Sequence, residues 1–297
     1  MADEPTTTTT LTELVAAEVV STAIKDYLID ANVIIPRFEF ASIAGRGTKS
    51  LAVPRWVKES AGVDITEGTE MDTEDLETLD VSITVAQVGV NREITDFAAE
   101  TVNIGPQALF NFVMMDGVAL CLEMAEDDGA AQFASLTGAT VGTSGSDLTV
   151  ANFVEALAKM RTINARGRYT ACFDDQAAYD LLAAIAASTG TVFANASTDQ
   201  SLLNARSDGV MGSLFGVECT VSNLTDTANT GADVVSAMWV DPASNPGHCP
   251  FTFVQLWGPR LKTNTNVDMP SWKGSTTMAY GVGTTHAAAG VKIVTDA

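Results

Sequence analysis

The sequence predicts an α+β fold built around one long helix. Residues 103–128 follow a helical pattern, which continues for about six turns after Pro106 without another proline. A strand pattern with a period of two lies just before them, at residues 78–96, and shorter helical and strand patterns alternate after them. At about 1.5 Å per residue the helix is about 35 Å long, enough to span a domain. We therefore expect it to form the spine of the molecule.

The ends and the inner face of this helix follow from particular residues. Asn103 can cap the N-terminus, and Pro106 sits near the first helical positions, where its missing N–H costs nothing. Large apolar residues then recur at spacings of three and four, which is typical of a helix face packed against other structure. This predicted inner face consists of Leu109, Phe112, Val113, Leu120 and Met124, with small Ala108 and Gly117 between them.

The chain before the spine divides into an arm, a long loop and a strand. A helical pattern from Leu11 to Ile29 forms the arm, which Pro36 ends. Residues 37–77 contain several glycines, Pro54 and short β-prone pieces such as SLAVPRWV, which indicates a long two-stranded excursion. The strand is predicted from apolar residues that alternate with polar ones, namely Leu79, Val81, Ile83 and Val85.

Helices and strands alternate after the spine. Residues 149–161 predict a helix with Phe153, Leu157 and Met160 on its inner side, and Asp174 or Asp175 is the predicted cap of the next helix. Between these two helices, RYTACF has the composition of a strand. LFGVECTVSNL, VVSAMWVD and the residues after 260 are also strand-like, so we expect the C-terminal part to return to the body as sheet.

The net charge of −21 excludes one class of protein. The chain up to Asp128 carries 24 acids against 7 bases, and the remainder carries 13 acids against 9 bases. Such a surface repels phosphate, whereas a sequence-specific reader of DNA or RNA shows a basic stripe. A solvated acidic surface, or adaptation to salty surroundings, is the simpler explanation of the charge taken alone.

Charge is sorted along the predicted loop. From Arg37 to Lys58 there are five bases and one acid, whereas Asp64 to Asp80 contains eight acids and no base. Exposed ion pairs contribute only about 0–1 kcal/mol each, but sorted charge fixes register between partners. We therefore predict that the loop contacts a neighbouring copy of the chain; a hairpin whose strands neutralise each other is the alternative. The contact candidates are Arg37, Arg46, Lys49, Arg55, Trp56, Lys58, Asp64, Glu67, Glu70, Asp72, Glu74 and Asp75, of which Trp56 suits an interface anchor.

No segment carries a complete catalytic or cofactor motif. GRGTKS departs from the phosphate-loop pattern, GVGTTH lacks the third glycine of a dinucleotide fingerprint, and GTSGS fails as a nucleophile elbow. His248 and Cys249 are neighbours in a proline-flanked stretch, which does not aim them at one another. The acids from Asp64 to Asp80 lack the glycine-centred pattern of a calcium loop. We predict no enzymatic activity, no cofactor and no metal site.

The cysteines and the apolar runs indicate where the protein works. The four cysteines lie far apart without paired spacing, which is typical of reduced thiols in an intracellular protein: Cys121, Cys172, Cys219 and Cys249. No apolar run approaches the roughly 20 residues that span a bilayer, and the acidic start differs from a secretory signal. We expect a soluble protein without a membrane partner.

The order of parts resembles a known architecture. TEGTEMDTEDLETLDVSITVAQVGVNREITDF is similar to the return arm of an extended loop and the strand that leads to a spine helix. LEMAEDDGAAQF is similar to the end of such a helix, GSLFGVECTVSNL to a Leu-x-Gly turn before a hydrophobic strand, and AGVKIVTDA to a closing peripheral strand. Together these segments resemble the major capsid proteins of tailed bacteriophages, which have the Hong Kong ninety-seven type shell fold.

This resemblance implies a plan of domains. Many relatives carry an N-terminal scaffolding segment, for which there is no room before the predicted arm, so a separate scaffold or none is expected. The implied regions are an N-terminal arm (1–36), an extended loop (37–77), a peripheral domain (78–172 and 261–297) that contains the spine helix (103–128), and an axial domain (173–260).

The resemblance also implies a function. Hexamers and pentamers of the chain would form an icosahedral head around double-stranded DNA, held non-specifically, in a virion assembled in the bacterial cytoplasm. Scaffolding, portal and decoration proteins are further partners of such shells. In some capsids of this fold a loop lysine is cross-linked to an asparagine of a neighbour, and Lys49 and Lys58 lie in the corresponding region. An encapsulin-like protein compartment of the same fold and a monomeric β-rich binding module are the alternatives.

Overall fold

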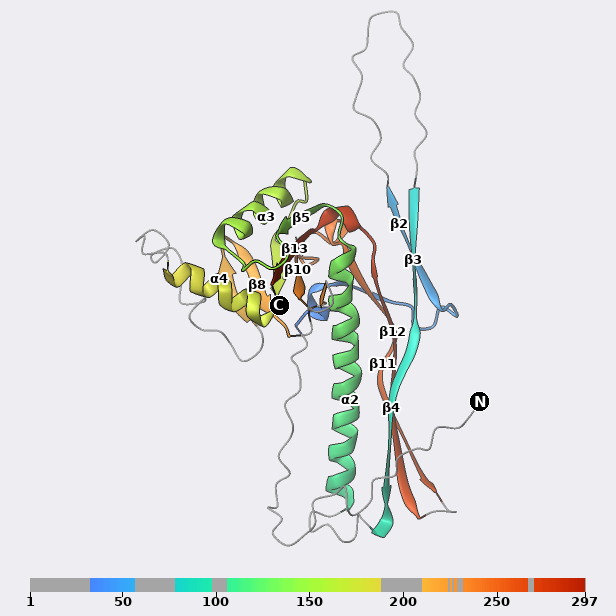
Figure 1. Cartoon of the computed structure of the whole chain (residues 1–297). Coiled ribbons are helices and arrows are strands. Elements are labelled where there is room, and N and C mark those ends of the chain that lie inside the picture. Colours follow the sequence, from blue (N-terminus) through green and yellow to red (C-terminus); the bar gives the residue numbers. More distant parts are fainter. Residues whose placement is uncertain are drawn as a thin grey trace, which may run out of the picture.

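The computed structural model describes two lobes and a projecting pair of strands (Figure 1). The described residues are 33–56, 78–97, 106–187, 210–223, 225, 227–228, 232–266 and 270–296. The predicted arm helix at Leu11–Ile29 therefore lies outside the described residues.

The first lobe contains the spine helix α2 (Pro106–Ala131), which lies along a sheet with the strand order β1-β11-β12-β4 (Figure 1). Strand β1 pairs with β11 in parallel, and the other neighbours are antiparallel. The strands of this sheet are β1 (Glu39–Ser42), β4 (Ala86–Thr95), β11 (Phe251–Asn266) and β12 (Ser271–Thr284).

The spine helix was predicted at 103–128, and it runs three residues further, to Ala131. Gly129 lies inside the helix and does not end it. A Cβ at this position would lie only 3.0 Å from Ile35 Cδ1, so the glycine allows the segment that contains Ile35 to pack closely on the helix. The alanines that follow are strong helix formers and continue the helix. Asn103, the predicted cap, lies outside the described residues.

The predicted inner face of the helix was wrong at Met124, which is 46% exposed. Buried Cys121 and Ala125 instead continue a stripe of small residues that begins at Gly117. A Cβ at Gly117 would lie 2.7 Å from Thr276 Oγ1, so the helix approaches β12 too closely for large side chains. Leu120 is half-buried, and the structure does not describe the side chains of the remaining predicted residues, Leu109, Phe112 and Val113.

The second lobe is a sheet with helices packed against it (Figure 1). Its described strands have the order β5-β13-β10-β6-β8-β7, and short β9 also pairs with β10. The helices are α3 (Val150–Thr162) and α4 (Asp175–Ala187). The strands are β5 (Ala139–Gly142), β6 (Tyr169–Phe173), β7 (Val210–Leu214), β8 (Val217–Val221), β9 (Thr227–Ala228), β10 (Asp233–Val240) and β13 (Val291–Asp296).

The local predictions for this lobe are confirmed. The Thr149 side chain accepts a hydrogen bond from the Asn152 backbone N–H at 3.2 Å and caps α3. Phe153 and Met160 of α3 are fully buried. Of the two aspartates proposed for the next helix, Asp174 is the cap, since its Oδ2 accepts from the Gln176 backbone N–H at 2.9 Å.

A cluster of aromatic rings joins the two lobes. Trp239 of β10 contacts Phe133, in the 3-10 helix η2 (Gln132–Ser135), with ring centroids 5.4 Å apart. Trp239 also contacts Phe251 of β11 at 5.5 Å, and Phe38 packs on Phe251 at 4.7 Å. All four rings are buried, so the lobes share one core. Strand β13 belongs to the sheet of the second lobe, and β11 belongs to the sheet of the first lobe. The limits of the predicted peripheral and axial domains stay predictions.

Candidate inter-subunit interface

The described base of the predicted extended loop is a ladder of two antiparallel strands, which we call the loop ladder. It consists of β2 (Ser50–Trp56) and β3 (Thr78–Thr84), paired from Ser50↔Thr84 to Trp56↔Thr78. Figure 1 shows that the outer ends of these strands stand apart from both lobes. After Val85 the chain enters β4, so the predicted strand at 78–96 changes its partner from β2 to β12.

The two faces of the loop ladder differ in chemistry. Residues directly opposite each other in an antiparallel pair share a face. One face carries the apolar pairs Leu51↔Ile83 and Val53↔Val81, whereas the other carries mainly small and polar residues. The exposure of the β3 side chains on this face rises with distance from the body, from 4% at Ile83 to 50% at Leu79. Leu79, opposite Arg55 at the outer end of this face, is therefore available to another molecule.

The inner end of the ladder sits on the outside of β12. Ile83 and Val85 form a small core with Ile43, Val254 and Ala279. The Val85 N–H donates to the Lys49 carbonyl at 2.8 Å, which closes the ladder at its base.

Two glycines of β12 shape this seat. A Cβ at Gly281 would lie 2.4 Å from the Thr84 carbonyl oxygen, and one at Gly283 would lie 2.7 Å from Ile83 Cγ1. The ladder can lie this close to β12 only because neither residue has a side chain.

A polar contact fixes the ladder further out. Arg55 of β2 places Nη1 3.1 Å from Nδ1 of His286, which follows β12 and precedes the 3-10 helix η5 (Ala287–Ala289). Burial lowers the pKa of His286 and the nearby positive charge of Arg55 lowers it further, while a hydrogen bond with the backbone of His286 itself opposes the fall.

A buried carboxylate anchors the chain where the N-terminal arm was predicted to end. Glu126 of α2 is 1% exposed and accepts the backbone N–H groups of three consecutive residues. The bond from Val33 is 2.6 Å long and that from Ile35 is 3.0 Å, with Ile34 bonded between them. Burial raises the pKa of Glu126, and the three N–H bonds oppose the rise.

Sequence reasoning missed Glu126. The signal that could have located it is its position directly after Ala125 on the stripe of small buried residues.

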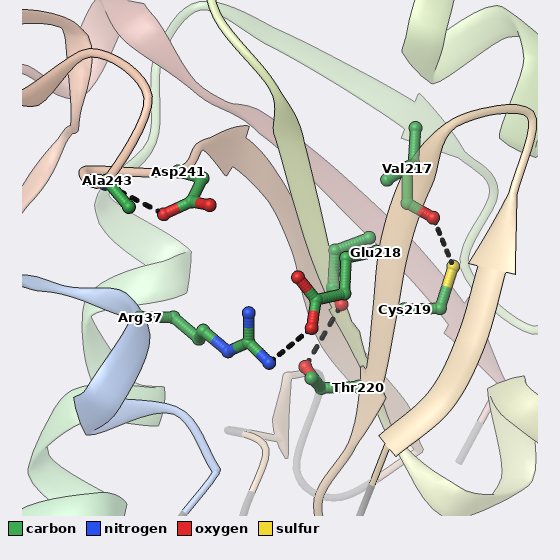
Figure 2. Close-up of polar contacts among 8 residues, drawn as sticks. Arg37, Val217, Glu218, Cys219, Thr220, Asp241 and Ala243 are labelled. Carbon is green, nitrogen blue, oxygen red and sulfur yellow. Dashed lines mark hydrogen bonds and ion pairs between the residues drawn. The ribbon is translucent and has the colours of Figure 1, made fainter.

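Arg37, the first predicted contact residue, is bonded within its own chain. Figure 2 shows its guanidinium reaching Glu218 of β8, with which it forms an ion pair through Nη2 and Oε1. The Arg37 carbonyl also accepts from Trp239 Nε1 at 3.2 Å. Nearby, the Thr220 hydroxyl donates to the Ala171 carbonyl, and the Ala243 N–H donates to Asp241 Oδ1 (Figure 2). Arg37 therefore ties the start of the loop to the second lobe.

The structure places the remaining contact candidates in three groups. Arg46 and Lys49 are exposed beside the foot of the ladder, and Lys49 is also one of the two proposed cross-link residues. Arg55 contacts His286, and Trp56 ends β2 opposite Thr78. Outside the described residues lie Lys58, Asp64, Glu67, Glu70, Asp72, Glu74 and Asp75.

The neighbours His248 and Cys249 serve other contacts. His248 Nδ1 accepts from the Arg166 backbone N–H at 3.4 Å, and the Cys249 thiol donates to the Phe251 carbonyl at 3.3 Å. Burial raises the pKa of Cys249 to about 11, which opposes activation as a nucleophile.

The described residues offer neither a metal-binding group nor a membrane-spanning helix. They contain no group of three or more His, Cys, Asp or Glu side chains placed to hold a metal ion. None of the helices in the described ranges is both long and apolar enough to cross a membrane.

Comparison with solved structures defines the class of fold. The chain matches a structure of Mycobacterium phage Che8 with a TM-score of 0.70 and 12% identity, over 93% of this chain and 96% of that one. It matches a cyanophage Pam1 capsid structure with a TM-score of 0.69 and 13% identity, over 100% and 99% of the two chains. A capsid structure of Helicobacter pylori bacteriophage KHP30 gives a TM-score of 0.69 at 10% identity, over 99% and 100%.

These matches confirm the predicted fold class, because the chain has the shell fold of phage capsid subunits along nearly its whole length. The identities of 10–13% mean that the likeness is one of fold. No protein-family model matches the sequence, and neither does any curated protein.

Proposed function

We propose that this chain is the major capsid subunit of a tailed bacteriophage, many copies of which form an icosahedral shell around double-stranded DNA. The observation that carries the proposal is the fold shared with phage capsid structures over nearly the full length of both chains. The loop ladder supports it, because a pair of strands that stands apart from the body and exposes Leu79 suits contact with another copy. The role is structural and needs no catalytic residue.

The contacts between copies would come from the extended loop. Arg46 and Lys49 are exposed, and the acids between Asp64 and Asp80 carry the opposite charge, so the loop of one copy and the body of the next can attract each other. Head-to-tail contacts of this kind close rings, which matches the hexamers and pentamers of an icosahedral shell. Arg37 and Arg55 have partners within their own chain and would act by positioning the loop.

The net charge of −21 suits a container for DNA. Phosphate binding needs lysine and arginine, so an acidic wall lets DNA pack without adhering. The partners in this proposal are the chain itself and non-specifically enclosed DNA, with scaffolding, portal and decoration proteins as further partners. The protein would be part of the virion, after assembly in the cytoplasm of the bacterial host.

Charge reversal at the foot of the ladder tests this proposal. Arg46→Glu together with Lys49→Glu should leave a folded subunit whose yield of particles at low salt falls at least about tenfold, because attraction between copies becomes repulsion. Part of the yield should return at high salt, since salt screens exposed charges. Size-exclusion chromatography with light scattering measures the yield of assembled particles.

The matched control reverses two exposed bases of α3, Lys159→Glu and Arg161→Glu, and changes the net charge equally. Assembly of the loop variant at the level of the unmodified protein, at low salt, would contradict the proposed contact. Equal loss in both variants would point to net charge alone.

A further inference from the structure

We infer that Arg55 and His286 form a clamp that holds the base of the extended loop on the body only while His286 is neutral, so that mild acidification releases the loop. The clamp is a property of the single chain, and it does not depend on the proposed shell function.

The chemistry of the contact fixes the state of the histidine. A guanidinium has only N–H donors, so the 3.1 Å contact between Arg55 Nη1 and His286 Nδ1 requires Nδ1 to be an acceptor. His286 must therefore be the neutral tautomer with its proton on Nε2. Protonation would convert Nδ1 to a donor as well. It would remove the hydrogen bond and set two positive charges against each other across the same short distance.

The charged neighbours of His286 do not offset a positive charge on it, and only a hydrogen bond with its own backbone, among the causes that act on its pKa, favours the charged form. The charged and titratable side chains that act on it are Arg55 of β2 and His248 of the 3-10 helix η4 (Pro246–His248), and neither is a carboxylate. The imidazole is also partly buried, which disfavours its charged form. Burial and the charge of Arg55 outweigh the backbone hydrogen bond and lower the pKa of His286, so the neutral, clamped form is favoured at neutral pH.

The position of Arg55 near the outer end of the ladder lets its contact with His286 hold the part of the ladder that has few other contacts with the body. Arg55 pairs with Leu79 across the ladder, four residues nearer to the loop tip than Leu51, which packs on the core beneath the ladder. Leu79 is half exposed, so hydrophobic contact with the body has weakened at this level. Loss of the clamp should therefore free the outer ladder, while Ile83 and Val85 keep its inner end in place.

The pH dependence follows from proton linkage. The clamped state has a lowered pKa at His286, so it binds fewer protons than the released state once the pH falls below the ordinary histidine pKa of about 6.5. Each pH unit below that value then shifts the equilibrium towards release by up to about tenfold, until the clamped histidine also titrates. Above pH of about 7 the clamp should be at full strength.

Hydrogen–deuterium exchange of the full chain tests the clamp. Backbone amides of β2 and β3 are followed from about pH 8 to about pH 5.5, corrected for the intrinsic pH dependence of exchange, at a concentration where the sizing profile does not change. We expect protection of the outer amides of these strands to fall by up to about tenfold across this range, and protection of the β10 amides to stay constant.

Three variants separate the clamp from other causes. His286→Gln keeps an acceptor for Arg55 but does not titrate, so the ladder should stay protected at both pH values. Arg55→Gln should leave the ladder poorly protected throughout, without the pH response. His248→Gln is the control and should keep the response, because the clamp residues are intact.

Protection of the β10 amides at about pH 8 that equals the protection in the unmodified chain shows that a variant is folded. The inference is overturned if the ladder of the unmodified chain shows no loss of protection on acidification, or if His286→Gln shows the same loss.

Discussion

At the residue scale, the buried carboxylate of Glu126 accepts three charge-assisted hydrogen bonds from one short backbone segment. Its two oxygens receive the N–H groups of Val33, Ile34 and Ile35, which are about 90 positions away in the sequence. These donors are the first N–H groups of the 3-10 helix η1 (Ile35–Arg37) and the residues before it, and helix ends need such acceptors. The carboxylate therefore caps one element while it belongs to another.

Removal of this acceptor should be costly. Glu126→Ala leaves three buried or partly buried N–H groups without their acceptor and should lower the free energy of unfolding by about 3 kcal/mol. Glu126→Gln keeps one oxygen and should cost about half as much. Urea unfolding followed by circular dichroism measures both values. Glu155→Ala is the control, since Glu155 makes only an exposed pair with Lys159 at 3.9 Å, and its effect should be near zero.

The buried cysteines give a second prediction at this scale. Burial raises the pKa of Cys172 and of Cys219 to about 12, and that of Cys249 to about 11. At about pH 8 the reactive thiolate is therefore scarce as well as inaccessible. A chromogenic disulfide reagent should label all four thiols in denaturant and none of them in the native protein over the same time. Rapid labelling of native protein would show that the described core is not closed.

At the element scale, close packing depends on residues that lack side chains. Gly117 allows α2 to approach β12, and Gly281 and Gly283 allow the loop ladder to cross β12. A Cβ at Gly281 would meet the backbone oxygen of Thr84 at 2.4 Å, and backbone cannot rotate away as a side chain can. The seat of the ladder is thus fixed by two positions in one strand.

Substitution of Gly281 should displace the ladder. Gly281→Ala should cost about 1–3 kcal/mol in the free energy of unfolding, as overpacked sites do, and should increase exchange of the Ile83 and Val85 amides. Gly247→Ala is the matched control, because its nearest neighbour would lie 3.8 Å from the new methyl group. If both variants unfold alike, the close crossing at Gly281 is not under strain.

The elements show what the sequence could and could not predict. Helix α3 was predicted within one residue at each end, because its cap, Thr149, and its buried face lie close together in the sequence. The inner face of α2 was wrong at Met124, since the distance to the sheet, which no local pattern reveals, decided that small residues line the contact. The alternation at residues 79–85 predicted a strand, but its change of partner at Val85 depends on chain segments far away in the sequence.

For the candidate site too, local sequence patterns were informative, whereas contacts between distant segments were not. Glycines, Pro54 and short β-prone pieces predicted the loop, and sorted charge selected its contact candidates, which stay predictions; Arg46 and Lys49 are exposed. Sequence reasoning grouped Arg37 with them, yet its partner, Glu218, is 181 positions away. Glu126 and His286 were not selected, because the groups that give them a role come from distant segments.

At the scale of the whole molecule, one hydrophobic core joins the sheet of the first lobe to the sheet of the second lobe. Trp239, Phe133, Phe251 and Phe38 make this junction continuous, so the two lobes should unfold together. In the proposed shell each copy would present a body with a fixed shape, and the ladder, which stands apart from both lobes, would be the part that reaches a neighbour (Figure 1). Curvature of a shell would then arise from contacts between copies.

The most direct test of the central claim is the state of the purified chain. Size-exclusion chromatography with light scattering, followed by negative-stain electron microscopy of the leading fraction, measures it, with and without co-expressed candidate scaffolding proteins. We predict closed, hollow particles of uniform size, built from many copies. A monodisperse monomer under every condition, including co-expression with the scaffold, would contradict the shell function.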